Sequence, residues 1–339
     1  MSAVSRRWRR PPIALPLARH AGSGLLAMVI CVAVAPMVLS NYQLVLFSGG
    51  IAYAVSVLGI ALGFASVGML ALTQPAMMLI GGYTALHLIA LWHLPFLLAA
   101  AIATLTGMVV AVPLGWLTCR LDRFAFAVLG FAFTYLVAML ASSGMVVDIT
   151  GGELGKPFPA AIAFGYPLRG LATYAAVSLV SLAAFAVAAV LFRSTLGRVL
   201  LIMRQDDIVA RAMGINTNLH RIALTAIVSG YGALGGALVG QATGFIAPPQ
   251  FDVALSISLL AMALVGGASY LFGAFAGTMA LQVAPALLGL AQDDRELLVG
   301  IVLLLCLAVV PNGILALLRP LPRMPLRPDK TPLASDHRP

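Results

Sequence analysis

The chain has 339 residues, of which 61% are hydrophobic and 9% are charged, and its mean hydropathy is +1.03. This composition excludes a water-soluble domain, because repeated apolar runs of membrane-spanning length leave too little polar surface. The net charge of +9 does not indicate a nucleic-acid-binding face, since the basic residues flank apolar runs instead of alternating with aromatic residues. We therefore predict an all-α, polytopic integral membrane protein that lies in a lipid bilayer.

The first apolar run, residues 22–39, follows five arginines: Arg6, Arg7, Arg9, Arg10 and Arg19. Two interpretations of this run are open. A signal peptide would use Ala33 and Ala35 as the small residues of its cleavage site, whereas Pro36, directly after Ala35, argues against cleavage. We expect residues 1–21 to form a basic cytoplasmic tail and residues 22–39 to form the first transmembrane helix.

Ten apolar runs are long enough to be transmembrane helices. They cover residues 22–39, 44–62, 76–92, 96–118, 124–145, 171–192, 222–243, 254–270, 272–290 and 297–318. The number of helices ranges from eight to ten, because residues 254–290 could instead form one long hairpin, or one span with a re-entrant segment.

The distribution of basic residues indicates the orientation. With a cytoplasmic N-terminus and ten spans, 17 of the 20 basic residues lie in inner segments, and only Lys156, Arg169 and Arg295 lie outside. Basic residues concentrate on the cytoplasmic side of membrane proteins, so both termini are predicted to be cytoplasmic. No Asp, Glu, Lys or Arg lies inside a predicted span, which disfavours proton-coupled transport. Residues 319–339, rich in proline and charge, are predicted to form a disordered cytoplasmic tail.

Helix-weakening residues interrupt the apolar character between residues 63 and 84. Non-helical backbone at membrane depth is stable only where protein or a wet cavity covers it. We therefore regard this region as a candidate lining for a substrate path. The candidate residues are Ser66, Gly68, Gln74, Gly81, Gly82 and Tyr83. The alternative is that the small residues here allow close packing of helices.

The longest predicted outer segment, residues 146–170, contains Thr150, Gly151 and Gly152. Two adjacent glycines can place backbone N–H groups close to an anionic group. A plain turn is the alternative use of the same residues. This loop is predicted to lie near the entrance of the protein or at a contact with a soluble partner.

A polar interval, residues 193–221, separates two apolar runs and holds five arginines and two aspartates. Asp206 and Asp207 are typical of a helix start, and Gly214 is typical of a helix end. The predicted helix has about two turns, and Ile208 and Met213 lie on the same side of it. It could lie on lipid headgroups as an amphipathic helix, or it could be gripped by a soluble partner.

This interval resembles the cytoplasmic segment of LivM-type permease subunits of branched-chain amino acid ABC importers. The resemblance rests on the run ARAMGIN at residues 210–216, on Gly197-Arg198, Arg204 and Asp207 before it, and on Arg221 after it. The early segment LGFASVGMLALTQPAMMLIGGYTA, residues 62–85, and the segments at residues 150–155 and 244–248 are similar to the same family. Gln74 departs from the polar group usual there in the family, so substrate identity is not carried over.

The resemblance covers about residues 44–318 and implies a permease domain at residues 22–318, in the inner membrane of a bacterium. It implies four kinds of partner: a second, homologous permease subunit, two ATPase subunits, a periplasmic or lipid-anchored binding protein, and the lipid bilayer. ATP and Mg would be bound by the partner subunits, since the chain lacks the phosphate-binding pattern Gly-x-x-x-x-Gly-Lys-Ser/Thr. We expect no catalytic residues, no cofactor and no metal in this chain, and no nucleic-acid partner.

The resemblance also implies that residues 193–221 form a coupling loop that transmits ATPase closure to the membrane. The residues to which it gives this role are Arg198, Arg204, Asp207, Ile208, Arg211, Met213, Gly214 and Asn216. Branched-chain or other hydrophobic amino acids are the implied substrates, with urea, short amides and aromatic acids as alternatives. An ATP-independent secondary transporter or a channel is the remaining alternative class.

Overall fold

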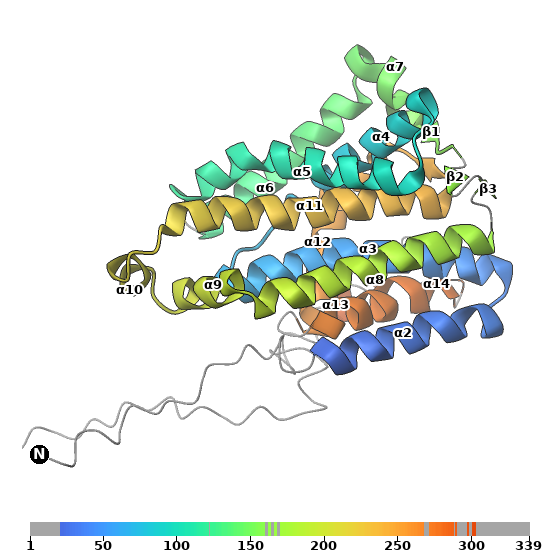
Figure 1. Ribbon diagram of the computed structural model, residues 1–339. Coiled ribbons are helices and arrows are strands. Elements are labelled where there is room, and N and C mark those ends of the chain that lie inside the picture. Colours follow the sequence, from blue (N-terminus) through green and yellow to red (C-terminus); the bar gives the residue numbers. More distant parts are fainter. Residues whose placement is uncertain are drawn as a thin grey trace, which may run out of the picture.

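The computed structural model describes residues 21–121, 123–159, 162–163, 166–167, 170–267, 271–287, 289, 297 and 300–302. In this part of the chain, long helices lie side by side in a bundle (Figure 1). Six of the helices are long and apolar enough to cross a membrane. These are α3 (Asn41–Val67), α4 (Gln74–Trp92), α5 (Phe96–Thr118), α6 (Arg123–Ser142), α8 (Leu171–Arg193) and α11 (Thr217–Thr243). The predicted helical architecture is confirmed, whereas the predicted run 297–318 lies almost wholly outside the described residues.

The centre of the bundle is α11, which packs against α3, α4 and α5. Glycines bring its backbone into contact with that of α4. A Cβ atom at Gly236 would lie 1.8 Å from the carbonyl oxygen of Met78, and one at Gly81 would lie 2.2 Å from that of Ala233. No side chain larger than hydrogen fits at such distances, so Gly236 of α11 and Gly81 of α4 serve helix packing within this subunit.

The helix α3 extends to Val67, five residues beyond the end of the span predicted at residues 44–62. Ser66 lies inside the helix, which ends at Gly68 in the left-handed conformation with a φ of 74°. Burial of residues 63, 65, 66 and 67 favours the helix despite the weak intrinsic propensity of Gly63, Ser66 and Val67. Between α3 and α4, only residues 68–73 are non-helical.

Protein covers this short non-helical stretch. The hydroxyl groups of Thr134 and Ser256 both donate hydrogen bonds to the carbonyl oxygen of Leu72, each at 3.1 Å. Gly130 of α6 lies close to the Leu72 and Thr73 backbone. The Leu72 carbonyl group of the break thus finds partners on α6 and on α12 (Val253–Gly266), as burial in an apolar environment requires.

The two predicted spans at residues 254–270 and 272–290 are shorter than expected. They consist of α12 (Val253–Gly266), α13 (Leu271–Thr278), the π-helical turn η4 (Met279–Val283) and α14 (Ala284–Leu287). At a rise of 1.5 Å per residue, α12 is about 21 Å long, which is less than the hydrocarbon core of about 30 Å. Added Cβ atoms at Gly266 and Gly277 would lie 1.9 Å from Gly273 O and 2.0 Å from Met262 O. The helices α12 and α13 therefore pack closely as an antiparallel hairpin. A hairpin was one of the two alternatives for residues 254–290.

Short elements close the two ends of the bundle. At one end lie η1 (Gly144–Val146), α7 (Val147–Thr150), η2 (Gly152–Leu154) and η3 (Pro248–Phe251), and two small antiparallel ladders. The ladders pair β1 (Lys156–Pro157) with β4 (Phe245–Ile246), and β2 (Ile162–Ala163) with β3 (Tyr166–Pro167). At the other end lie α9 (Thr195–Gln205) and α10 (Asp207–Ala212), while α2 (Ala21–Val38) packs against α8 and α13 (Figure 1).

Candidate functional site

The polar interval folds as two helices, α9 and α10, where the sequence indicated only the second. The helix α9 was not predicted, because its charged residues made the segment look like a polar loop. One side of this helix is apolar, and Leu200 and Met203 are buried there. The predicted limits of α10 are confirmed. Asp206 Oδ1 accepts hydrogen bonds from the backbone N–H groups of Ile208, at 2.8 Å, and Val209, at 3.3 Å. Gly214 follows the helix with a φ of 79°, a conformation that favours glycine.

Charged groups attach α10 to the first turn of α11. Asp207 Oδ2 lies 2.7 Å from Arg211 Nη2, and Asp207 Oδ1 lies 3.4 Å from Arg221 Nη2. Arg211 Nε also donates to Thr217 Oγ1 at 3.1 Å. Asn216 caps α11, since its side-chain oxygen accepts from the Leu219 N–H group at 3.2 Å. Asp207 and Arg211 therefore hold α10 in place relative to α11, whereas Asn216 caps α11 itself. Arg221 was not predicted to take part.

An apolar surface remains exposed on α10 and on the start of α11. The exposed fractions are 79% for Ile208, 49% for Val209, 65% for Met213 and 61% for Leu219. We call these four residues the α10 apolar patch. Exposed apolar side chains that gather at one place are typical of a protein or membrane contact. The sequence had placed Ile208 and Met213 on the same side of the helix, and in the structure both are exposed.

The remaining two arginines of the predicted coupling set form hydrogen bonds within this subunit. Arg204 Nη1 donates to the Ala65 carbonyl oxygen at 2.6 Å, near the end of α3, where carbonyl groups lack helical partners. Arg198 Nη2 donates to Thr195 Oγ1 at 3.1 Å, within α9. Arg204 thus links α9 to α3, whereas Arg198 contacts only its own helix through this bond.

We expect Arg204→Ala to lower the free energy of unfolding by about 1–2 kcal/mol, the usual worth of a hydrogen bond to a charged group that is partly exposed. The matched change Arg198→Ala should have an effect near zero, because its bond is exposed and local. Thermal unfolding of the two purified variants in detergent would measure the difference. Equal melting temperatures for the two variants would contradict the structural role of Arg204.

The six residues of the predicted substrate path are placed mainly at helix contacts. Gln74 is fully buried, and its Nε2 donates to the Val228 carbonyl oxygen at 3.0 Å, near the middle of α11. Added Cβ atoms at Gly59 and Gly232 would lie 2.5 Å from Gln74 Nε2 and 2.0 Å from Gln74 Oε1. These two glycines therefore make room for the Gln74 amide between α3, α4 and α11.

Gly81 and Gly82 contact α11 in the same way, at Ala233 and at Gly236. Tyr83 donates its hydroxyl proton towards the carbonyl oxygens of Thr150, at 2.8 Å, and Ile246, at 3.4 Å. Ser66 is buried, and Gly68 ends α3. In the described part of the chain, these positions fit the packing alternative, and none of the six lines the two larger cavities. Their role in a substrate path stays a prediction.

The outer loop forms a plain turn, the second of the two uses considered for it. The Gly151 N–H group donates to the Val147 carbonyl oxygen at 2.7 Å, and the Gly152 N–H group donates to Thr150 Oγ1 at 3.1 Å. Thr150 Oγ1 in turn donates to the Ala141 carbonyl oxygen at 2.6 Å. Since both glycine N–H groups have partners within the loop, they are not directed at a separate anion.

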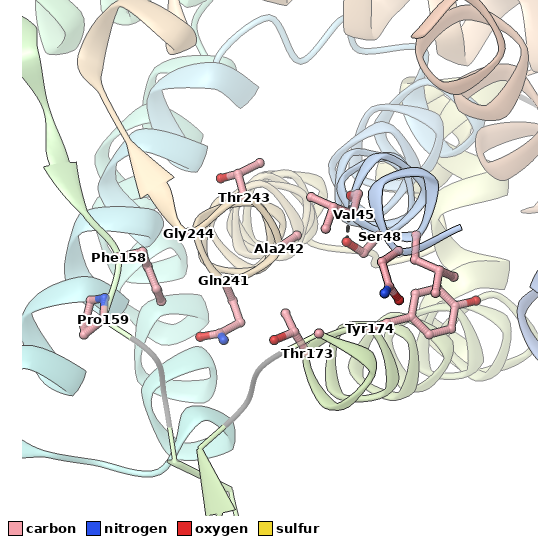
Figure 2. A pocket seen from close by; sticks show the side chains of 13 residues that line it. Val45, Ser48, Phe158, Pro159, Thr173, Tyr174, Gln241, Ala242, Thr243 and Gly244 are labelled. Atoms are coloured by element: carbon pink, nitrogen blue, oxygen red, sulfur yellow. Dashed lines mark hydrogen bonds between the residues drawn. The ribbon is translucent and has the colours of Figure 1, made fainter. Parts of the chain in front are cut away.

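A cavity of about 470 Å³ opens at the end of the bundle opposite α10. Figure 2 shows that its walls come from α3, α8, the end of α11 and the segment that contains Phe158. Its polar lining residues are Asn41, Ser48, Thr173, Tyr174, Gln241 and Thr243. Sequence reasoning missed this cavity, because these residues come from three helices far apart in the chain and share no motif.

A second cavity, of about 520 Å³, lies between α5, α8 and α11 and is lined almost entirely by apolar side chains such as Leu105, Val187 and Leu234. The bundle thus combines an exposed apolar patch at one end with a polar cavity at the other. Both are arranged around α11.

Comparison with known proteins decides the family. The family model described as "Branched-chain amino acid transport system / permease component" matches residues 43–309. The chain belongs to this permease family. It is therefore a multi-pass membrane protein and a permease component of a transport system.

Curated relatives agree with this assignment. This permease is 25% identical over 324 residues to the high-affinity branched-chain amino acid transport system permease protein LivM of Salmonella typhimurium, a match that covers 87% of the chain and 75% of LivM. It is 26% identical to LivM of Escherichia coli over 326 residues, with the same coverage. It is 25% identical to LivH of Salmonella typhimurium over 289 residues, 78% of the chain and 92% of LivH. No solved structure matches this permease.

Proposed function

We propose that this chain is the membrane-spanning subunit of an ABC importer that moves branched-chain or other hydrophobic amino acids across the inner membrane of a bacterium. The observation that carries the proposal is the match of residues 43–309 to the permease family, together with similarity to LivM and LivH proteins named for branched-chain amino acid transport. A second, homologous permease subunit, two ATPase subunits and a periplasmic or lipid-anchored binding protein complete the transporter.

Separate ATPase subunits supply the energy, with ATP and Mg bound by them. The α10 apolar patch supports the proposal that separate ATPase subunits bind this chain. Ile208 and Met213 are exposed on a short helix that is held against α11 by the Asp207–Arg221 ion pair and the Arg211–Thr217 hydrogen bond. Burial of apolar side chains of this size stabilises a contact by about 1.5–3 kcal/mol each when they are fully covered. A groove on each ATPase subunit would receive them, and movement of α10 would alternate the access of the transport path.

Uptake of radiolabelled leucine into proteoliposomes tests this function. The liposomes would contain this chain with its partner permease and ATPase subunits, the binding protein outside and Mg-ATP on the ATPase side. We expect uptake that requires ATP hydrolysis and that is not reduced by excess urea, acetamide or benzoate. Uptake without ATP would instead indicate a secondary transporter or a channel, and uptake of urea, an amide or an aromatic acid in place of leucine would change the substrate class.

A further inference from the structure

Three helix ends meet around the cavity at the end opposite α10. The first residue of α3, Asn41, and the N-cap of α8, Gly170, lie on its wall, and so do Gln241 to Gly244 at the end of α11. The N-cap Gly170 has no side chain to accept a bond from the first N–H groups of α8. The described lining residues carry no formal charge.

The helix ends give this uncharged cavity an electrical polarity. Backbone N–H groups without helical partners carry partial positive charge at the start of a helix, and unpaired carbonyl groups carry partial negative charge at its end. The start of α8 and the start of α3, where Ser40 already caps the Gln43 N–H group, therefore favour an anionic group, and the end of α11 favours a cationic group. A ligand that matches both sides carries one charge of each sign.

Gln241 gives an independent indication of a ligand. The residue is only 5% exposed, and its Oε1 atom has no hydrogen-bond partner among the described residues. Figure 2 shows that its amide projects from α11 into the space between α8 and the Phe158 segment. A buried amide without a partner is costly, so a group that completes its hydrogen bonds would bind favourably here. Rotation about the last side-chain bond can present either the oxygen or the nitrogen of the amide.

Other buried polar groups of the cavity are already satisfied by the protein. The Tyr174 hydroxyl donates to the Val32 carbonyl oxygen at 2.7 Å, and the Ser48 hydroxyl donates to the Val45 carbonyl oxygen at 2.8 Å. Apolar walls come from Leu44 and Phe158, which are 7% and 6% exposed. The volume of about 470 Å³ lies within the usual range of small-molecule sites, roughly 300–1,000 Å³.

We infer that this cavity is a binding site for a small zwitterionic amino acid with an aliphatic side chain. The carboxylate lies at the starts of α3 and α8, the ammonium group donates to Gln241 Oε1 at the end of α11, and the side chain contacts Leu44 and Phe158. The inference rests on the proposed transport function and adds to it a substrate site inside this subunit. Polarised helix ends and neutral amides replace charged side chains in this recognition.

Binding of tritiated leucine to the full chain in lipid nanodiscs tests the inference, with no binding protein present. We expect Gln241→Leu to weaken leucine binding roughly ten-fold or more, as loss of a hydrogen bond to a charged group does. Gln250→Leu is the matched control, because Gln250 is exposed on η3 at the same end of the bundle and outside the cavity lining. Gln241→Glu keeps the shape and should gain binding of leucinamide, which has the ammonium group and lacks the carboxylate.

Competition with unlabelled ligands distinguishes recognition of the ammonium group from recognition of the carboxylate and the aliphatic side chain. Leucine should displace the label, whereas 4-methylpentanoate, which lacks the ammonium group, should displace it poorly. Equal competition by 4-methylpentanoate, or equal binding by Gln241→Leu and Gln250→Leu, would overturn the inference. If the wild-type chain binds no leucine while the complete transporter still takes it up with ATP, the site is wrong and the proposed function stands. If ATP-dependent uptake is also absent, the proposed function fails as well.

Discussion

Gly81→Ala is expected to prevent stable assembly of the bundle. The added Cβ atom would lie 2.2 Å from the Ala233 carbonyl oxygen and 2.4 Å from its Cα atom. Ordinary carbon contacts are about 3.5–4.0 Å, so α4 and α11 must separate by roughly 1 Å or more. Overpacking of this kind costs about 1–3 kcal/mol and more where backbone obstructs it. We expect a lower melting temperature and a severalfold lower yield of monodisperse protein on size-exclusion chromatography in detergent.

Gly49→Ala is the matched control, since a Cβ atom added at Gly49 in α3 meets nothing within 4 Å. This variant should be as stable as the wild type or more stable, because alanine is the better helix former by about 1 kcal/mol. Gly236→Ala, on the facing helix, should reproduce the effect of Gly81→Ala. The double variant should cost less than the sum of the two, because both open the same contact. Wild-type stability of Gly81→Ala would show that the helices are not in backbone contact.

Gly214→Pro is expected to abolish transport while leaving the membrane helices intact. Gly214 has a φ of 79°, and proline fixes φ near −65°. Proline also removes the N–H group that donates to the Arg211 carbonyl oxygen at 2.9 Å. The cost of about 3 kcal/mol or more falls on the turn between α10 and α11. The expected result is ATP hydrolysis without leucine uptake, measured as the ratio of the two rates in proteoliposomes.

The control for this change is Gly214→Asn. A Cβ atom at Gly214 meets nothing within 4 Å, so sterically the position accepts a side chain and only its backbone conformation is restrictive. Asparagine tolerates the left-handed conformation better than other residues with side chains. It should keep most of the uptake. Unchanged uptake by Gly214→Pro would show that the orientation of α10 does not couple ATP hydrolysis to transport.

Much of the bundle could be predicted because long apolar runs fix where membrane helices lie. The expected limits of α5, residues 96–118, agree with the structure, and those of α8 differ by one residue. The extent of α3 could not be predicted, since Gly63 and Ser66 are weak helix formers whose burial outweighs their propensity. The short length of α12 could not be predicted either, because the sequence at residues 254–270 is as apolar as that of a full transmembrane span.

Within residues 193–221, the structure was predictable where local chemistry determines it. Asp206 and Gly214 mark the ends of α10 through capping, which depends only on neighbouring residues. The contact of Asp207 with Arg221, and that of Arg204 with Ala65, join segments that sequence spacing does not relate. The same reason applies to the cavity at the end opposite α10, where Ser48, Tyr174 and Gln241 come together only in the folded bundle.

The glycine contacts between α11 and α4 bring the two backbones together without intervening side chains. Long side chains can absorb a small displacement by changing rotamer, but touching backbones cannot. A displacement of α10 would therefore move α11 as a rigid body, and α4 would move with it through the contacts of Gly81 and Gly236. The far end of α11, about 40 Å away, carries Gln241. Mechanical work done at one surface of the protein would thus reshape the chamber at the other without any relay of side-chain switches.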